Sequence, residues 1–358
     1  MAPAPWPVFA LLAACALLSA SLSALAIGYA HRRRLFDLPG RRRSHAQATP
    51  RGGGIGIVVC VIAASLVFWP NRVEAAALAS ALALVGLVGW IDDHRGLAAR
   101  WRLLAHALAA GILLVAFRSD LSERAADWLA FAGVEPNAAL GTLALLLIGV
   151  WLVWSVNLHN FMDGIDGILA MQALFVFAVA VVAFAHAGTP PEAIGSAVCL
   201  AATCGFLPFN FPRARVFMGD VGSGVLGLLL GLILLGLSLH PRLAAGSGLV
   251  AGSAFLIDAT CTLLMRIAHG RRWYSAHREH LYQWLVRIGF SHARVVAFYM
   301  GWNLLIVMPT LWWINRADAQ DHGGLVTAAL LVLGVVAWHC GKRWCLKVAG
   351  LESSRAAA

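Results

Sequence analysis

The run ALGTLALLLIGVWLVWSV at residues 139–156 contains no charged side chain and leads directly into the polar segment NLHNFMDGIDG at residues 157–167. A membrane crossing takes about 20 apolar residues, so the run predicts a transmembrane helix that ends at a cluster of polar groups. Comparable runs recur along the 358-residue chain, which is 60% hydrophobic and 12% charged. The usual values are roughly 45–50% and about a quarter. The composition predicts a single all-α, polytopic membrane domain over residues 1–358 and excludes disorder, a coiled coil and a soluble dinucleotide-binding enzyme.

Apolar windows bounded by charges predict eleven crossings, with ten as the alternative because the seventh window is short. The windows lie near residues 6–28, 54–70, 75–91, 103–117, 139–156, 167–185, 193–207, 223–239, 243–264, 294–314 and 324–341. An odd number of crossings would place the two termini on opposite faces of the membrane. Lipoprotein-like and signal-peptidase-like sites occur at 12–15 and 24–26, but no Lys or Arg precedes this stretch, so we interpret it as a retained first span.

Basic residues are strongly divided between the two sets of predicted loops. Of the 27 Lys and Arg residues, 22 fall in the loops near 31–53, 92–102, 208–222 and 265–294 and in the tail from 342. The other set contains Arg72, Arg118, Arg124, Arg242 and Arg316. The positive-inside rule predicts that the first set is cytoplasmic and that the N-terminus lies outside. Acidic residues of the outer loops, among them Glu74, Asp120 and Glu192, are interpreted as ordinary solvated charge.

Five of the 17 acidic residues fall at predicted cytoplasmic span ends, in three short segments. The first segment ends the third span with Asp92 and Asp93. Neighbouring residues on a helix point about 100° apart, so the two carboxylates can serve two different partners. A pair of aspartates at a helix end also occurs on ordinary surfaces, so this segment indicates function only together with others.

The second segment places Asn157, Asn160, Asp163 and Asp166 at every third position. This spacing predicts a polar stripe along one side of a helix or 3₁₀ turn. Amide and carboxylate oxygens are hard ligands of the kind that Mg²⁺ takes together with substrate phosphates. The alternative is a polar loop that is stabilised by its own amide hydrogen bonds.

The third segment, FMGDVGSG at residues 217–224, surrounds Asp220 with glycines at the start of an apolar span. Backbone N–H groups at a helix start form an anion site, and here that site would contain a potential metal ligand. The segment is no P-loop, because the GK[ST] ending is missing. Gly224, Gly227 and Gly231 could equally serve close helix packing.

The predicted cytoplasmic loop 265–294 is rich in arginine and histidine, which suits phosphate binding and predicts a substrate-recognition loop. His277 and His280 lie close to aromatic residues there and form its most site-like pair, while any single arginine could simply orient the protein. Asp258 stands apart within a predicted span, where ionisable groups are functional or paired.

Read together, Asp-Asp, NxxNxxDGxDG and FxGDxGSxxxG resemble the polyprenyl-phosphate N-acetylhexosamine-1-phosphate transferases of glycosyl transferase family 4. That family makes the first lipid-linked peptidoglycan precursor and initiates O-antigen and teichoic acid synthesis. The stretches 37–39, 43–45 and 49–54 also look like the first cytoplasmic loop of the family, so the resemblance extends from residue 37 to about 294.

The resemblance implies a bacterial inner-membrane enzyme that transfers an amino-sugar 1-phosphate from a UDP-sugar to undecaprenyl phosphate and releases UMP. It implies Mg²⁺ as cofactor, with Mn²⁺ as the alternative, membrane lipids and no nucleic acid as partners, and leaves a homodimer open. Asp92 and Asp93 match the catalytic pair that deprotonates or orients the lipid phosphate, and Asp220, with Asn160 or Asp163, matches the metal site. The implied substrate-binding residues are Asn157, Asp166, Gly219, Ser223, Arg266, His277, His280, Arg43 and His45.

The chain departs from the family pattern at one place that bears on the identity of the sugar. Where many family members have His-Leu-His-His, this chain has His280-Leu281-Tyr282-Gln283, which favours a small amino sugar and the O-antigen or lipopolysaccharide type over the pentapeptide-bearing peptidoglycan substrate. An ion-coupled transporter is the alternative from another class, but it predicts acidic groups near the bilayer midplane, where only Asp258 falls. A CDP-alcohol phosphotransferase lacks support because its DGxxAR motif is absent.

Overall fold

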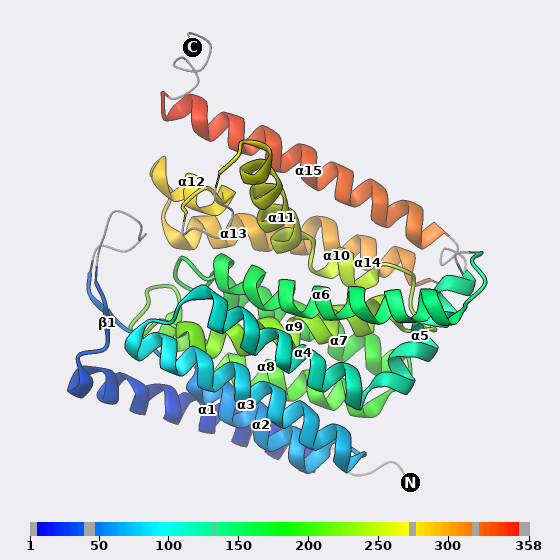
Figure 1. Cartoon of the computed structure of the whole chain (residues 1–358). Coiled ribbons are helices and arrows are strands. Elements are labelled where there is room, and N and C mark those ends of the chain that lie inside the picture. The colour runs from blue at the N-terminus through cyan, green and yellow to red at the C-terminus, as the bar shows by residue number, and fades with distance from the viewer. Residues whose placement is uncertain (1–5, 39–46, 132, 272–276, 317–321, 351–358) are drawn as a thin grey trace.

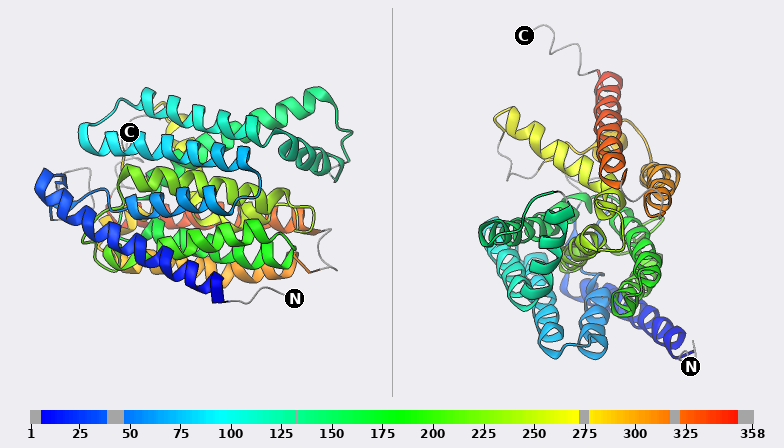
Figure 2. Two further views of the ribbon diagram at one scale, coloured as in Figure 1. Left: turned by 90° about the horizontal axis from the view of Figure 1, so that it is seen from below. Right: turned by 90° about the vertical axis from the view of Figure 1, so that its right-hand side faces the viewer.

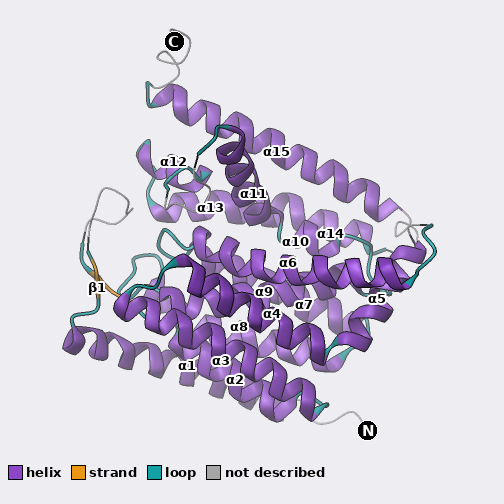
Figure 3. Ribbon diagram, in the orientation of Figure 1, coloured by secondary structure: helices purple, strands orange, loops and turns teal. Residues whose placement is uncertain are grey.

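A computed structural model describes residues 6–38, 47–131, 133–271, 277–316 and 322–350, and these residues are almost entirely helical (Figure 3). The early elements are α1 (Trp6–Arg33), β1 (Phe36–Asp37), β2 (Thr49–Pro50), α2 (Ile55–Phe68), α3 (Arg72–Arg95), α4 (Ala99–Ala116) and α5 (Arg118–Phe131). The central ones are α6 (Ala138–Met162), α7 (Ile168–His186), α8 (Pro190–Asn210) and α9 (Gly219–Leu239). The last are α10 (Ser247–Ala251), α11 (Ser253–Ala268), α12 (Leu281–Arg287), α13 (His292–Trp302), the π-helical turn η1 (Asn303–Val307), α14 (Met308–Ile314) and α15 (Gly323–Val348).

Within the described residues, nine helices are long and apolar enough to cross a membrane: α1, α3, α4, α6, α7, α8, α9, the continuous α13–η1–α14 and α15. This confirms the all-α, multi-pass fold. The remaining predicted spans, 54–70 and 243–264, correspond to the 14-residue α2 and to α10 and α11, which are separated at Gly252. The number of eleven crossings therefore stays a prediction.

The long helices lie roughly side by side and alternate in direction (Figure 1). One end of the bundle, on the left in Figure 1, holds the last turn of α3, the last turn of α6 and the first turn of α9. We call it the acidic end, because Asp92, Asp163 and Asp220 lie there. The other end, which we call the opposite end, holds Arg72 and Arg118 at the starts of α3 and α5. The two sets of loops that differ in basic residues therefore lie at the two ends of one bundle. Which end faces the cytoplasm stays a prediction.

Helix α9 occupies the centre of the bundle and packs against α3 and α6. Its small residues permit this approach: a Cβ on Gly227 would lie 2.8 Å from the Cα of Val156. Polar groups of α6 bond across the contact, since the Ser155 hydroxyl donates to the Gly227 carbonyl oxygen at 2.8 Å and the Trp151 indole to that of Gly231 at 2.9 Å. In membranes, close packing and interhelical hydrogen bonds replace the hydrophobic effect between helices. Gly227 and Gly231 are therefore packing glycines.

The outer helices form two groups around this centre. Helix α1 packs on α8 and α2, whereas α11, α12 and α15 pack together on the far side of α6, as the end-on view in Figure 2 shows. Strands β1 and β2 pair antiparallel, with Phe36 opposite Pro50. The chain after β2 then pairs with the segment before α9, where Gly53 N–H donates to the Phe217 carbonyl oxygen at 2.9 Å. This pairing brings the N-terminal loop to the acidic end.

Candidate active site

Asp92, Asp93 and Asp220 come together because the end of α3 lies directly against the start of α9. Gly89 makes the contact possible, since a Cβ at that position would overlap the backbone of Asp220. Gly219 adopts φ +76°, and a side chain there would meet the Asp93 carboxylate and the backbone of Gly52. The glycines of this motif therefore let three backbone segments converge around carboxylates.

The two neighbouring aspartates of α3 have different partners, as their angular separation predicts. Asp93 accepts hydrogen bonds from the backbone N–H groups of Asp220 at 3.0 Å and Val221 at 3.2 Å, so it caps the start of α9. Asp92 accepts the backbone N–H of Leu97 and an Arg102 guanidinium N–H at 2.9 Å. Asp93 is therefore bound to the backbone of α9, whereas Asp92 faces the cationic side chain of Arg102.

Arg102 joins the two halves of the acidic cluster. Its Nη1 lies 2.9 Å from Asp92 Oδ2 and 3.0 Å from Asp220 Oδ2, so one guanidinium nitrogen bridges acids that are 128 residues apart. Sequence reasoning did not single out this residue. Arg102 is one of several basic residues in its loop, and nothing in its spacing shows that the first turn of α4 faces α9. Arg51 also lies within electrostatic reach of both α3 aspartates.

The predicted stripe of Asn157, Asn160, Asp163 and Asp166 diverges at the end of α6. The Asn157 amide lies 3.4 Å from His106 Nδ1 of α4, whereas Asn160 Oδ1 accepts from the Ser223 hydroxyl of α9 at 3.2 Å. Asp163 ends the helix.

Beyond that point the chain turns, and the Asp166 carboxylate contacts His292 Nδ1 at 3.2 Å and accepts the backbone N–H of Ala214 at 3.2 Å. The regular spacing therefore extends beyond the helix, and its members face three different neighbours.

Asp163 is a half-buried carboxyl in negative surroundings. Burial raises its pKa to about 7, and the charges of Asp93 and Asp166 add to the effect. Like charges nearby disfavour the ionised form, and a bound cation would reverse this.

Asp163, Asp220 and Asn160 offer hard oxygen atoms, so the donor set fits Mg²⁺. Among the residues that the structure describes, no three His, Cys, Asp or Glu side chains are already arranged as metal ligands. These donors would therefore hold the ion together with substrate oxygens.

The described part of the loop 265–294 packs on the end of α6, and several of its predicted binding residues have internal partners. Arg266 is buried and forms an ion pair with Glu279, which also binds Arg271 at 2.7 Å. His280 is 3% exposed and lies 3.8 Å from Asp258, with the His277 ring 4.9 Å away between centroids. Substrate binding by Arg266, His277 and His280 stays a prediction. Arg43 and His45 lie outside the described residues.

Asp258, the ionisable residue predicted within a span, is 2% exposed and holds several elements together. Its carboxylate accepts the backbone N–H of Leu281 at 2.8 Å, the Tyr299 hydroxyl at 2.6 Å and the Trp338 indole at 2.9 Å. It thereby fixes the start of α12 between α11, α13 and α15. Buried carboxylates need such partners.

The departure from the His-Leu-His-His pattern has a structural consequence. Tyr282 is fully buried, and its hydroxyl donates at 3.0 Å to the carbonyl oxygen of Phe161, two residues before Asp163. Gln283 donates to the same hydroxyl oxygen at 3.1 Å. The two residues that replace histidines therefore tie α12 to the end of α6.

Known proteins are similar to this chain in sequence. The sequence model of glycosyl transferase family 4 matches residues 75–238, which include Asp92, the polar stripe and Asp220. The chain is 31% identical over 354 residues to decaprenyl-phosphate N-acetylglucosaminephosphotransferase of Mycobacterium leprae, covering 86% of this chain and 83% of that relative.

Two other relatives are similar. The chain is 26% identical to a protein of Bacillus subtilis named a probable undecaprenyl-phosphate N-acetylglucosaminyl 1-phosphate transferase, covering 78% and 79% of the two chains. It is 29% identical to phospho-N-acetylmuramoyl-pentapeptide-transferase of Geobacillus kaustophilus, covering 74% and 84%. The relatives are all sugar-phosphate transferases, and this multi-pass membrane chain belongs to glycosyl transferase family 4.

Proposed function

We propose that this protein transfers an N-acetylamino-sugar 1-phosphate from a UDP-sugar to undecaprenyl phosphate, with release of UMP. The bridge from Arg102 to Asp92 and Asp220, with Asp93 holding the start of α9 beside them at one end of an apolar helix bundle, is the observation that carries the proposal. A site in this position can meet a lipid phosphate that enters from the bilayer and a nucleotide that arrives from water. The names of the relatives support the same class of acceptor and of transferred sugar phosphate.

The reaction brings two anions together. An oxygen of the lipid phosphate attacks the sugar-bearing phosphorus of the UDP-sugar, a new P–O bond forms, and the bond to UMP breaks. Asp92 accepts the proton of the lipid phosphate or orients it, and Arg102 offsets the negative charge between Asp92 and Asp220. Mg²⁺ held by Asp220, Asp163 and Asn160 would neutralise the diphosphate and the departing UMP. Asp93 keeps the start of α9, and hence Asp220, in place.

The loops at the acidic end also contain most of the Lys and Arg residues of the chain. This supports a bacterial inner-membrane protein whose acidic end faces the cytoplasm. We propose N-acetylhexosamine as the sugar and initiation of O-antigen or another surface polysaccharide as the pathway. The structural roles of Tyr282 and Gln283, together with the N-acetylglucosamine named for two relatives, support this choice over the pentapeptide substrate.

The test uses purified protein in liposomes with undecaprenyl phosphate, Mg²⁺ and separate UDP-sugars: UDP-N-acetylglucosamine, UDP-N-acetylgalactosamine and UDP-N-acetylmuramoyl-pentapeptide. Mass spectrometry of the lipid product and release of UMP are measured. We expect a lipid diphosphate-linked N-acetylhexosamine, formed by wild type and by the control Asp127→Asn at the opposite end, but not by Asp92→Asn. Product from the pentapeptide donor alone would assign the protein to peptidoglycan synthesis, and lipid product without UMP would refute the reaction.

A further inference from the structure

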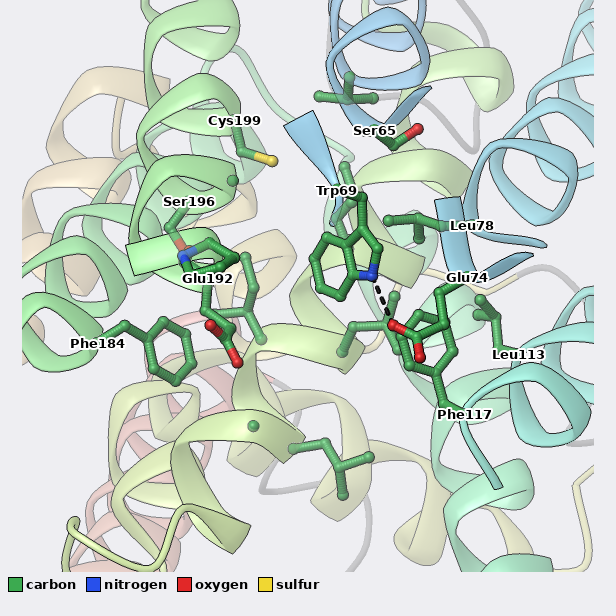
Figure 4. Close-up of a pocket in the computed structure, with 18 of the residues that line it drawn as sticks. Ser65, Trp69, Glu74, Leu78, Leu113, Phe117, Phe184, Glu192, Ser196 and Cys199 are labelled. Carbon is green, nitrogen blue, oxygen red and sulfur yellow. Dashed lines mark hydrogen bonds between the residues drawn. The ribbon is translucent and has the colours of Figure 1, made fainter. Parts of the chain in front are cut away.

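The opposite end of the bundle contains a cavity of about 330 Å³ between α2, α3, α4, α6, α8 and α9, far from the acidic cluster (Figure 4). Its volume falls within the range of small-molecule sites, which begins at roughly 300 Å³. Most of its wall is aliphatic or aromatic and includes Leu78, Leu113, Leu152 and Leu229. A wall of this kind favours contact with an apolar group.

Charged side chains join this wall at the helix ends. Glu74 and Glu192 come from the first turns of α3 and α8, and Asp120 and Arg124 come from α5. In Figure 4 Glu192 faces the Trp69–Glu74 pair across the cavity. These three acids thus line one cavity that has an apolar interior, while the Asp120 side chain is still 49% exposed. Their interpretation as ordinary solvated charge stays a prediction.

The cavity wall contains more negative than positive side chains. Arg124 lies 2.9 Å from Asp120 and 3.9 Å from Glu192. The Glu74 carboxylate accepts from two neutral donors, Trp69 Nε1 at 2.7 Å and Asn71 Nδ2 at 2.9 Å. Three carboxylates and one guanidinium thus line the cavity, which favours a cationic ligand group near Glu74 and Glu192.

We infer that this cavity binds an amphiphile with one apolar chain that ends in a primary ammonium group. The chain would occupy the leucine-lined interior, and the ammonium group would lie between Glu74 and Glu192, where it can donate up to three hydrogen bonds. The site is separate from the acidic end, and its existence does not rest on the proposed transferase function.

Photoaffinity labelling of the full-length protein in phosphatidylglycerol nanodiscs tests the inference. The probes are a ten-carbon primary amine and the matching ten-carbon alcohol, each with a diazirine at the end of the chain, and labelled peptides are located by mass spectrometry. We expect labels on the cavity-facing residues of α4 and α9, with about fivefold more from the amine, as for an ion pair at a partly exposed position. Equal labelling by both probes, or labels only elsewhere, would overturn the inference.

Three variants separate this site from general partitioning into the bilayer. Glu192→Gln removes one carboxylate, so we expect about threefold less labelling by the amine and no change with the alcohol. Glu123→Gln, an exposed acid of α5 outside the cavity wall, is the matched control and leaves both probes unchanged. Gly195 lines the cavity, and a Cβ there meets open space, so Gly195→Phe fills the site and abolishes labelling by both probes.

Persistent labelling of Gly195→Phe would overturn the inference. If that variant does not fold, the comparison of Glu192→Gln with Glu123→Gln decides the question. Addition of lysophosphatidylethanolamine, a lipid with a single acyl chain and a primary ammonium group, to the nanodiscs distinguishes two sources of the ammonium group. Competition with the amine probe assigns the ligand to a membrane lipid, and absence of competition assigns it to a free amine.

Discussion

The two ends of the helix bundle both bring acidic residues from distant helices together, but they do so in opposite ways. At the acidic end, glycines let α3 and α9 approach until Asp93 accepts backbone amides of α9 and Arg102 bridges Asp92 and Asp220. At the opposite end, Glu74, Asp120 and Glu192 stand apart around an apolar cavity. Close packing concentrates negative charge that can attract cations, whereas loose packing leaves room for an apolar group.

The strongest expected contrast between the ends comes from the acidic cluster itself. Asp92→Asn and Asp220→Asn should each lower turnover at least about a hundredfold, because loss of one general base or charge-stabilising group has effects of this size. UMP release in liposomes measures the loss, and proteolysis of intact membranes checks that the protein is still inserted. Asp127→Asn is the control. Near-normal turnover in either variant would remove that residue from the reaction.

Arg102 tests whether the acidic end depends on the cation that bridges its two halves. Arg102→Gln leaves two neighbouring carboxylates without their shared counter-ion, so we expect turnover to fall about tenfold or more and the Mg²⁺ concentration for half-maximal rate to change. Arg102→Lys restores the charge without the planar donor geometry and should recover part of the rate. Unchanged kinetics in Arg102→Gln would show that the bridge has no role in turnover.

The ends should also differ in their response to acid. Burial, helped by nearby cations, lowers the pKa of His277 at the acidic end to about 4 and that of His240 at the opposite end to a lesser extent. The unfolded chain binds these protons at an ordinary histidine pKa of about 6.5, so stability is lost as pH falls from about 6.5 toward 4.

Thermal unfolding at pH 7 and pH 5 measures this loss. The drop in Tm from pH 7 to pH 5 should be smaller in His277→Gln than in wild type. In His240→Gln the drop should lie between those of the other two proteins. Equal drops in all three proteins would contradict the assignment of acid sensitivity to these histidines.

The smallest effect is expected at the opposite end. Glu74→Gln weakens the bond from the Trp69 indole and removes a negative charge from the first turn of α3, so stability should fall by about 1 kcal/mol. Turnover should not change, because the acidic cluster lies at the other end of α3. A parallel measurement of Tm and UMP release checks both statements, and a loss of turnover at unchanged Tm would mean that the two ends are coupled.

Much of the site could be predicted from sequence, since Asp92, Asp93 and Asp220 stand out as scarce charges beside apolar runs. Arg102 could not, because an arginine near a span end also satisfies the positive-inside rule. The spacing predicts that Asp166 shares a stripe with Asn157, but the helix ends at Asp163 and the Asp166 side chain turns toward His292. Asp258 was expected to be functional or paired, and only the packing of α11, α13 and α15 shows that its partners are structural.

The sequence by itself determined that this is a multi-pass helical membrane protein, because apolar runs of membrane length leave the backbone no other way to satisfy its hydrogen bonds in lipid. It also determined which acids gather near span ends, since charge is costly within the bilayer. Only the tertiary structure decided which acids share an arginine, which cap a helix and which line a cavity. Those outcomes depend on contacts between helices distant in the chain, and the spacing of residues along one helix carries no information about which neighbour it faces.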